Sequence, residues 1–188
     1  MIDFSKVSKE KVNSILQRSN ITNLNSEDIV QQILNQVIYH PLMLNVSTSR
    51  TIIAEEVMRI SNAQPGISIG ENKEFVKITI DITGSQELLD MVLVYLPLDR
   101  YLFIEGRTLT FKKFSEHRIT DNDPIKAALK QDSKAAFNQV EAVFQNINER
   151  YGHFVDNELK PYIHEAIERE IKRRIQNRKD IDDLNPFV

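Results

Sequence analysis

The stretch from His164 to Glu168 is the closest approach to a catalytic motif in this chain. Glu168 lies four positions after His164, so on a helix the two side chains share one face, as the ligands of a metalloprotease helix do. A glutamate stands where that motif has its second histidine, and no third ligand is identifiable. Because a solvated, charged helix face explains the same residues, we expect no metal and no other cofactor.

Asp99 and the triplet Glu105–Arg107 come nearest to the acidic pattern with which restriction-type nucleases hold Mg²⁺. The spacing is short, arginine replaces the lysine, and Gly106 suits a hairpin turn instead. Gly84 has no lysine motif after it, so it indicates a turn or bulge and not a phosphate loop. We therefore predict no catalytic residues and expect a protein that is not an enzyme.

A basic cluster near the C-terminus is the strongest polar signal in the sequence. The residues that could contact phosphate are Arg169, Lys172, Arg173, Arg174 and Arg178. Cations at that place also stabilise the end of a helix, and neighbouring acidic residues weaken their field. With a net charge of -3, the chain as a whole has no general attraction for nucleic acid. The cluster makes nucleic-acid binding the alternative function.

Two amphipathic helices are predicted before the first strand. One begins near Ser8, and the other runs from Asn25 or Ser26 to about Tyr39, where His40-Pro41 ends it. The second helix has a broad apolar stripe, which we expect to pack on a sheet.

Strand patterns follow in the middle of the chain. The segments that favour strand are 42–58, 75–82, 91–95, 102–104 and 108–111. In the first of them Ala54-Glu55-Glu56 favours helix, so a helix there is the alternative to the strand that we expect. A turn is predicted at Gln64–Gly66, and another at Glu105-Gly106. Consecutive pairing of these strands would give an antiparallel meander.

A long helical segment is predicted after Asp121–Pro124, which combines capping residues with a proline suited to a first turn. Its apolar stripe contains Ile125, Leu129, Phe137, Val140, Phe144, Ile147 and Tyr151. Gly152 could end a first helix and Pro161 could instead kink a continuous one, so the sequence leaves a hairpin and a kinked rod open.

These patterns predict an α+β fold with N-terminal helices, a small antiparallel sheet, and a long C-terminal helical hairpin or kinked rod. We expect residues 1–120 to form the sheet domain and 121–188 a helical segment packed on it, as one structural unit. Of the 188 residues, 41% are hydrophobic and none is cysteine, which suits a globular protein in a reducing compartment. The N-terminus has no apolar signal segment, and the longest apolar run, Met91–Leu96, is too short to cross a bilayer. We therefore expect a cytoplasmic protein with no membrane contact.

The order of features resembles the N-terminal region of a family of uncharacterised bacterial proteins. The resemblance rests on residues 80–89, 104–111 and 144–174, including the step Phe154–Leu159 and the pair Arg173-Arg174. Some members of that family have a downstream domain like a restriction endonuclease, and their setting suggests defence against phage. The resemblance implies a regulatory or assembly part of such a system, and it brings no catalytic residue to this chain.

The leading functional hypothesis is a non-enzymatic interaction module. The apolar stripe of the long helix is longer than a small sheet can cover, so we expect part of it to be buried against another chain. The expected partner is a second copy of the chain or a different protein.

Overall fold

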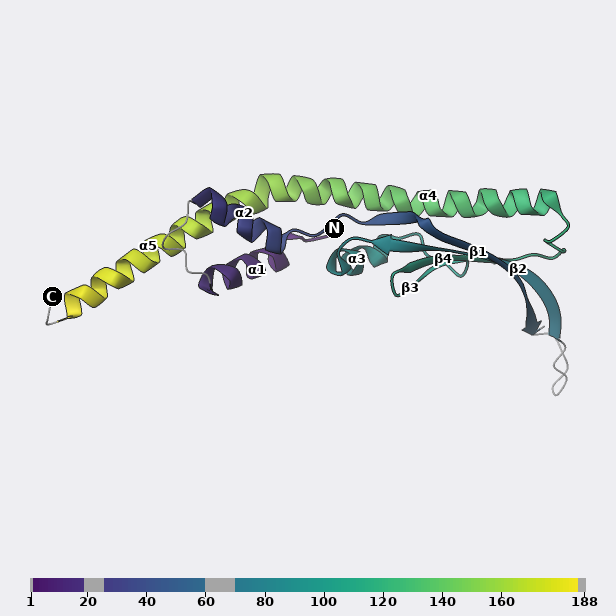
Figure 1. Cartoon of the computed structure of the whole chain (residues 1–188), viewed down its shortest axis with the longest axis horizontal. Coiled ribbons are helices and arrows are strands. Elements are labelled where there is room, and N and C mark those ends of the chain that lie inside the picture. Colours follow the sequence, from purple (N-terminus) through teal and green to yellow (C-terminus); the bar gives the residue numbers. More distant parts are fainter. Residues whose placement is uncertain (1, 19–25, 60–69, 186–188) are drawn as a thin grey trace. The chain divides into compact units, whose positions relative to one another are not determined.

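The computed structural model describes residues 2–18, 26–59 and 70–185 (Figure 1). The predicted turn at Gln64–Gly66 lies outside these residues. Contacts divide the chain into two compact units, one made of the segments up to Tyr39 and from Ile147 onward, the other of His40–Asn146. This division differs from the boundary expected at residue 120, because the long helix contributes its first part to one unit and its remainder to the other.

The first unit is helical. It contains α1 (Ser5–Arg18), α2 (Ser26–Val37), the last turns of α4 (Asp123–Phe154), a π-helical turn (Val155–Leu159) and α5 (Lys160–Leu184). Both α1 and α2 pack against α5 and against each other. Their buried apolar side chains include Val12, Leu16, Ile29, Ile33, Leu34, Val37, Leu159, Ile163 and Ile167. The expectation that the second helix packs on the sheet is wrong, since its stripe faces these helices.

An aromatic cluster closes the core of this helical unit. The ring of Tyr151 lies 5.1 Å from that of Phe4 and 5.3 Å from that of Tyr39, between ring centroids. The hydroxyl oxygen of Tyr151 accepts a hydrogen bond from the backbone N–H of Tyr39 at 3.1 Å. Burial raises the pKa of Tyr151, so its phenol stays neutral.

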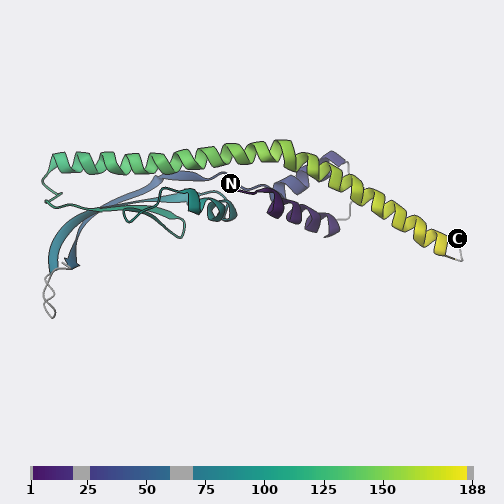
Figure 2. The same ribbon diagram turned by 180° about the vertical axis from the view of Figure 1, so that it is seen from behind.

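The long helix is continuous from Asp123 to Leu184, so the rod is the alternative that the structure adopts. Gly152 lies inside α4 and does not end it. Pro161 follows the π-helical turn, where its missing N–H and its ring are accommodated, and the helix changes direction there (Figure 1 and, from behind, Figure 2). The side-chain amide of Asn157 donates to the carbonyl oxygen of His153, a backbone acceptor at the edge of the irregular turn.

The second unit contains one antiparallel sheet of four strands. These are β1 (Met43–Arg59), β2 (Gly70–Thr83), β3 (Leu102–Glu105) and β4 (Thr108–Phe114). Their order in the sheet is β1-β2-β4-β3, so it is not the meander that the sequence suggested. The chain passes from β2 through α3 (Gln86–Val92) to the far edge, and the β3–β4 hairpin then brings β4 back beside β2.

The predicted strand at residues 91–95 is wrong, because this segment ends α3 and continues as a 3₁₀ turn, Leu93–Tyr95. Leu88, Leu89 and Val92 share one face of the helix and are fully buried. Gly84 forms the turn before α3 with a φ of 111°, and a Cβ on it would lie 2.3 Å from the carbonyl oxygen of Pro41. The prediction that Gly84 marks a turn is confirmed.

The part of α4 in this unit lies over one face of the sheet. The ring of Phe137 packs edge-on against Phe111, at 6.4 Å between centroids, and Asp132 forms an ion pair with Lys113 on β4. Asn122 caps the helix by accepting from the backbone N–H of Ile125 at 3.2 Å. We call this face the helix-covered face of the sheet.

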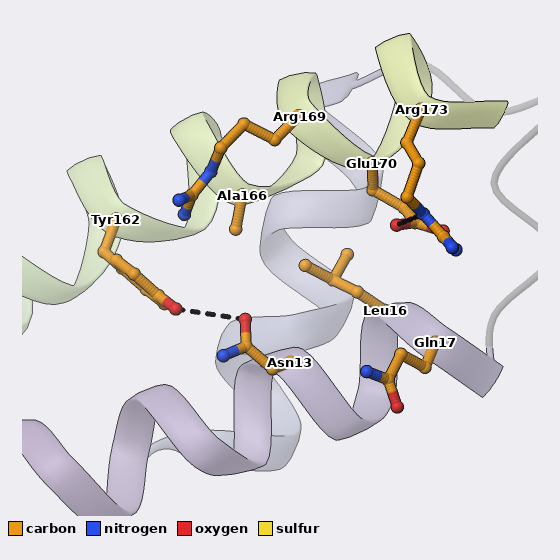
Figure 3. A pocket seen from close by; sticks show the side chains of 8 residues that line it. All are labelled: Asn13, Leu16, Gln17, Tyr162, Ala166, Arg169, Glu170 and Arg173. Atoms are coloured by element: carbon orange, nitrogen blue, oxygen red, sulfur yellow. Dashed lines mark hydrogen bonds and ion pairs between the residues drawn. The ribbon is translucent and has the colours of Figure 1, made fainter. Parts of the chain in front are cut away.

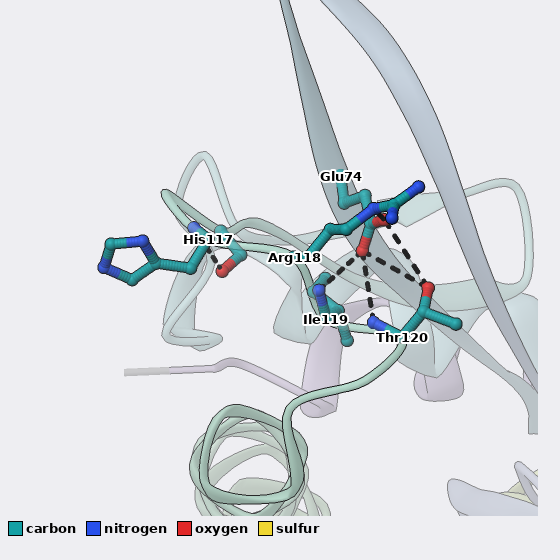
Figure 4. A network of polar contacts seen from close by, with 6 residues as sticks. Glu74, His117, Arg118, Ile119 and Thr120 are labelled. Carbon is teal, nitrogen blue, oxygen red and sulfur yellow. Dashed lines mark hydrogen bonds and ion pairs between the residues drawn. The ribbon is translucent and has the colours of Figure 1, made fainter.

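A largely buried carboxylate fixes the loop that leads into α4 (Figure 4). One carboxylate oxygen of Glu74, on β2, accepts hydrogen bonds from the backbone N–H groups of Ile119 and Thr120 at 2.6 and 3.3 Å. Arg118 lies 3.6 Å from the other oxygen. This network orients the start of α4, and its polar groups satisfy one another.

Candidate interaction surface

The apolar stripe of the long helix is largely buried within the chain itself. Leu129, Val140, Phe144, Ile147 and Tyr151 are buried, and the side chains of Ile125 and Phe137 are partly exposed. The stripe residues up to Phe144 belong to the sheet unit, and Ile147 and Tyr151 belong to the helical unit. The small sheet therefore does not have to cover the whole stripe. The structure thus offers little of this stripe to a partner.

Most of the exposed large apolar residues of the sheet unit lie instead on β1, an edge strand, and the others are Val94 and Tyr95 on the 3₁₀ turn after α3. Ile52 is 54% exposed, Ile53 44% and Val57 62%. Among the described residues no strand pairs with the outer edge of β1, which therefore presents backbone N–H and C=O groups. The sequence pattern predicted a strand here but not its place at an edge, because strand order is set by contacts far apart in the chain.

β1 has only part of the usual protection of edge strands, since it carries charged side chains such as Arg50 and Glu55 but is long. It is 17 residues long, contains neither proline nor lysine, and has one irregularity in register, between Asn45 and Arg50. The β2–β4 pairing runs only from Phe75 to Asp81, so beyond Ala54 the strands β1 and β2 continue as a two-stranded ribbon (Figure 1). In the sequence, the β-prone segment 42–58 is much longer than 108–111, and this difference in length could have predicted that β1 extends beyond the rest of the sheet.

A groove of about 270 Å³ adjoins this edge on the helix-covered face. Thr51 and Ile53 of β1 line one side, and Leu129 of α4 lines another. Lys126 and Lys130 on α4 also line it. The groove is therefore apolar inside and carries positive charge on its helical side.

The opposite face of the sheet has charged and aromatic side chains. Lys112 forms an ion pair with Glu56 at 2.5 Å, and its ammonium lies 4.4 Å from the ring centre of Phe75 and 5.0 Å from that of Phe114. Because the lysine already covers these rings, they do not form an open platform for stacking bases.

The basic cluster on α5 is partly tied down inside the helical unit (Figure 3). Arg173 donates to both carboxylate oxygens of Glu170 at 2.8 and 2.9 Å, and Arg174 donates to the same carboxylate at 2.7 Å. Arg174 also donates to the carbonyl oxygen of Leu16 near the end of α1, at 3.1 Å. These hydrogen bonds, led by that from Arg173, lower the pKa of Glu170 to about 2.

The remaining cations of the cluster differ in their surroundings. The Arg169 guanidinium lies 5.7 Å from the ring centre of Tyr162, at an open depression that Asn13 also lines, and the hydroxyl of Tyr162 donates to Asn13 at 3.0 Å (Figure 3). Lys172 and Arg178 are exposed. The cluster therefore offers three cations to an external anion, while Arg173 and Arg174 are engaged with Glu170.

The candidates for chemistry do not assemble into a site. His164 and Glu168 are exposed on α5, and within residues 2–18, 26–59 and 70–185 no group of three or more histidine or acidic side chains is placed to hold a metal ion. Asp99 accepts hydrogen bonds from two backbone N–H groups of its own turn. A carboxylate oxygen of Glu105 lies 3.7 Å from the ammonium nitrogen of Lys77. No helix in the described part of the chain is long and apolar enough to cross a membrane.

No known protein family matches this chain, and searches of curated proteins and of solved structures find no match.

Proposed function

We propose that this protein is an interaction module that binds a partner strand at the outer edge of β1. The observation that carries the proposal is this edge itself, which is long, without a paired strand in the described residues, and exposes Ile52, Ile53 and Val57. A strand added there would satisfy the backbone groups of β1 through main-chain hydrogen bonds. Its alternate side chains would cover the exposed apolar residues and enter the groove beside Ile53.

Physical chemistry favours this surface over the apolar stripe. Exposed isoleucine and valine side chains release water when they are covered, worth roughly 25 cal/mol for each Å² buried. The stripe residues Val140 and Phe144 already have this stabilisation within the chain, whereas Ile53 and Val57 still have exposed apolar surface that a partner can cover.

Site-specific photo-cross-linking in the cells that naturally make the protein tests the proposal. A photoreactive residue in place of Ile53 should give a covalent adduct of defined mass, because a bound strand lies within bond-forming distance. The same residue in place of Lys134, an exposed position on α4, is the matched control. The absence of an adduct at position 53, or the same yield of adduct at positions 53 and 134, would contradict strand addition at this edge.

Nucleic-acid binding is the competing function, and it rests on Arg169, Lys172 and Arg178. Phosphate contacts through these cations would give an affinity that falls steeply with salt. Binding of a short duplex that weakens when Lys172 and Arg178 are both replaced by glutamate would support it. Binding that ignores both salt and these substitutions would count against it.

A further inference from the structure

We propose that the partner strand is β1 of a second copy of this chain, paired antiparallel about a two-fold axis beside Ile53. This inference rests on the proposed function and goes further by naming the partner and the register. Two sheets would then join edge to edge into one continuous sheet of eight strands. The two-fold axis makes each contact occur twice, so a modest set of complementary side chains is enough to select one register.

The symmetry limits the registers that are available. A two-fold axis perpendicular to the joined sheet keeps the helix-covered faces of both copies on one side. Residues that oppose each other across the new pair must then point to the same face, so only registers centred on a residue are allowed. From Arg50 to Arg59 the pairing of β1 with β2 is regular, and the side chains alternate without interruption.

The register centred on Ile53 matches side chains on both faces. On the helix-covered face, Ile53 meets its own copy, and Thr51 lies opposite Glu55. On the other face, Arg50 lies opposite Glu56, and Ile52 lies opposite Ala54. Arg50 and Glu55 are exposed and form no ion pair with any described residue, so both have charge available for a partner. Glu56 already pairs with Lys112, and its carboxylate would be shared between Lys112 and Arg50 of the second copy.

Charge complementarity extends to the groove. Glu55 of the second copy would lie opposite Thr51, which lines the groove together with Lys126 and Lys130 of α4. Lys130 is exposed and forms no ion pair within the described chain. An acidic side chain entering beside these lysines is therefore attracted by the helical side of the groove.

Neighbouring registers match less well. Centring the pair on Ile52 leaves Arg50 opposite Ala54, and centring it on Ala54 places Ile53 opposite Glu55. Centring it on Glu55 opposes two like charges, which destabilises a cross-strand pair. Of these registers, only the one centred on Ile53 pairs Arg50 with a glutamate.

Cysteine cross-linking tests this register in the full chain, which has no cysteine of its own. Opposed residues in an antiparallel pair have Cα atoms roughly 4.5–5.5 Å apart, within the range a disulfide needs. Ile53→Cys alone should form a disulfide dimer under mild oxidation. Thr51→Cys and Glu55→Cys should each fail alone, since the same residue recurs about 13 Å away, and should cross-link when mixed.

A charge exchange provides an independent test. Arg50→Glu places like charges opposite each other twice, and should raise the dimer dissociation constant by about tenfold or more. Glu56→Arg should do the same, and a mixture of the two variants should form the heterodimer at near wild-type affinity. This rescue shows that both variants fold, and Lys134→Glu serves as the control for net charge.

The outcomes separate the inference from the proposed function. Cross-linking in the stated pattern with rescue in the mixture supports the two-fold pair. A dimer that cross-links at other positions and ignores Arg50→Glu overturns the register. A wild-type chain that stays monomeric at every concentration overturns the second copy as partner, while a photo-adduct at Ile53 with a different protein would still support strand addition.

Discussion

Replacing Glu170 with glutamine removes the charge that holds α5 to the end of α1. The side chain of Glu170 is 12% exposed and that of Arg174 is 26% exposed, so their hydrogen bond is partly shielded from water. Arg174 in turn donates to the carbonyl oxygen of Leu16. Glutamine keeps one acceptor oxygen but loses the negative charge and the second one, so the hydrogen bonds from both guanidinium groups weaken, and with them the orientation of Arg174 toward α1.

The size of the effect follows from the pKa of Glu170, which the arginines lower from 4.5 to about 2. At about 1.4 kcal/mol for each pKa unit, the ceiling is about 3 kcal/mol. The side chain of Arg173 is 61% exposed, so solvent screens much of its share. We therefore expect Glu170→Gln to lower the free energy of unfolding of the helical unit by about 1–2 kcal/mol at neutral pH.

Urea unfolding followed by circular dichroism, together with amide hydrogen exchange in α1, measures this change. Glu168→Gln is the matched control, because it removes the same charge from an exposed position of the same helix. Since the pKa of Glu170 is lower in the folded state than in the unfolded state, its stabilisation is complete above about pH 4.5 and is lost as the pH falls toward 2. The gap between the wild type and Glu170→Gln should close over that interval.

Two results would refute this reasoning. One is a Glu170→Gln protein as stable as Glu168→Gln at neutral pH, with unchanged exchange in α1. The other is a stability gap that persists unchanged down to about pH 2, which would mean that the charge of Glu170 is not its cause.

Three further substitutions test the local structure by thermal or urea unfolding. Gly152→Ala should stabilise the chain by about 0.5–1 kcal/mol, because this helical glycine is exposed and a Cβ on it meets nothing within 4 Å; a loss of stability would contradict a continuous helix. Gly84→Ala should destabilise by more than about 2 kcal/mol, since its φ is 111° and the Cβ would collide with Pro41; an unchanged midpoint would contradict that turn. Tyr151→Phe should cost about 1–2 kcal/mol by leaving the buried N–H of Tyr39 without its acceptor; a neutral effect would contradict that hydrogen bond.

The fold class was predictable because it depends on local periodicity. The capping residues before Pro124 and the strand alternation at 75–82 determine their elements from nearby residues alone. The error at residues 91–95 arose where an apolar run suits strand and helix equally. There the spacing of Leu88, Leu89 and Val92 decides for the helix, and that spacing begins before the run.

The candidate surface was not predictable in the same way. Whether Ile53 is covered depends on which strand lies at the edge, and that follows from the pairing of β4 with β2, more than 25 residues apart. Likewise, the sequence does not show which elements bury Phe144 and Tyr151, so the apolar stripe seemed available to a partner. Arg173 and Arg174 looked available for phosphate in the sequence. Glu170 lies one helical turn before them and pairs with both, but the charge pattern alone does not distinguish such ion pairs from a solvated helix face.

The most direct test of the central claim is the molar mass in solution, measured by size-exclusion chromatography with light scattering over a range of concentrations and at low and high salt. The wild-type chain should approach twice its 21.8 kDa, and Ile53→Lys should remain at the mass of one chain with an unchanged circular dichroism spectrum. A wild-type mass of one chain at all concentrations, or a dimer that Ile53→Lys leaves intact, would contradict assembly through the edge of β1.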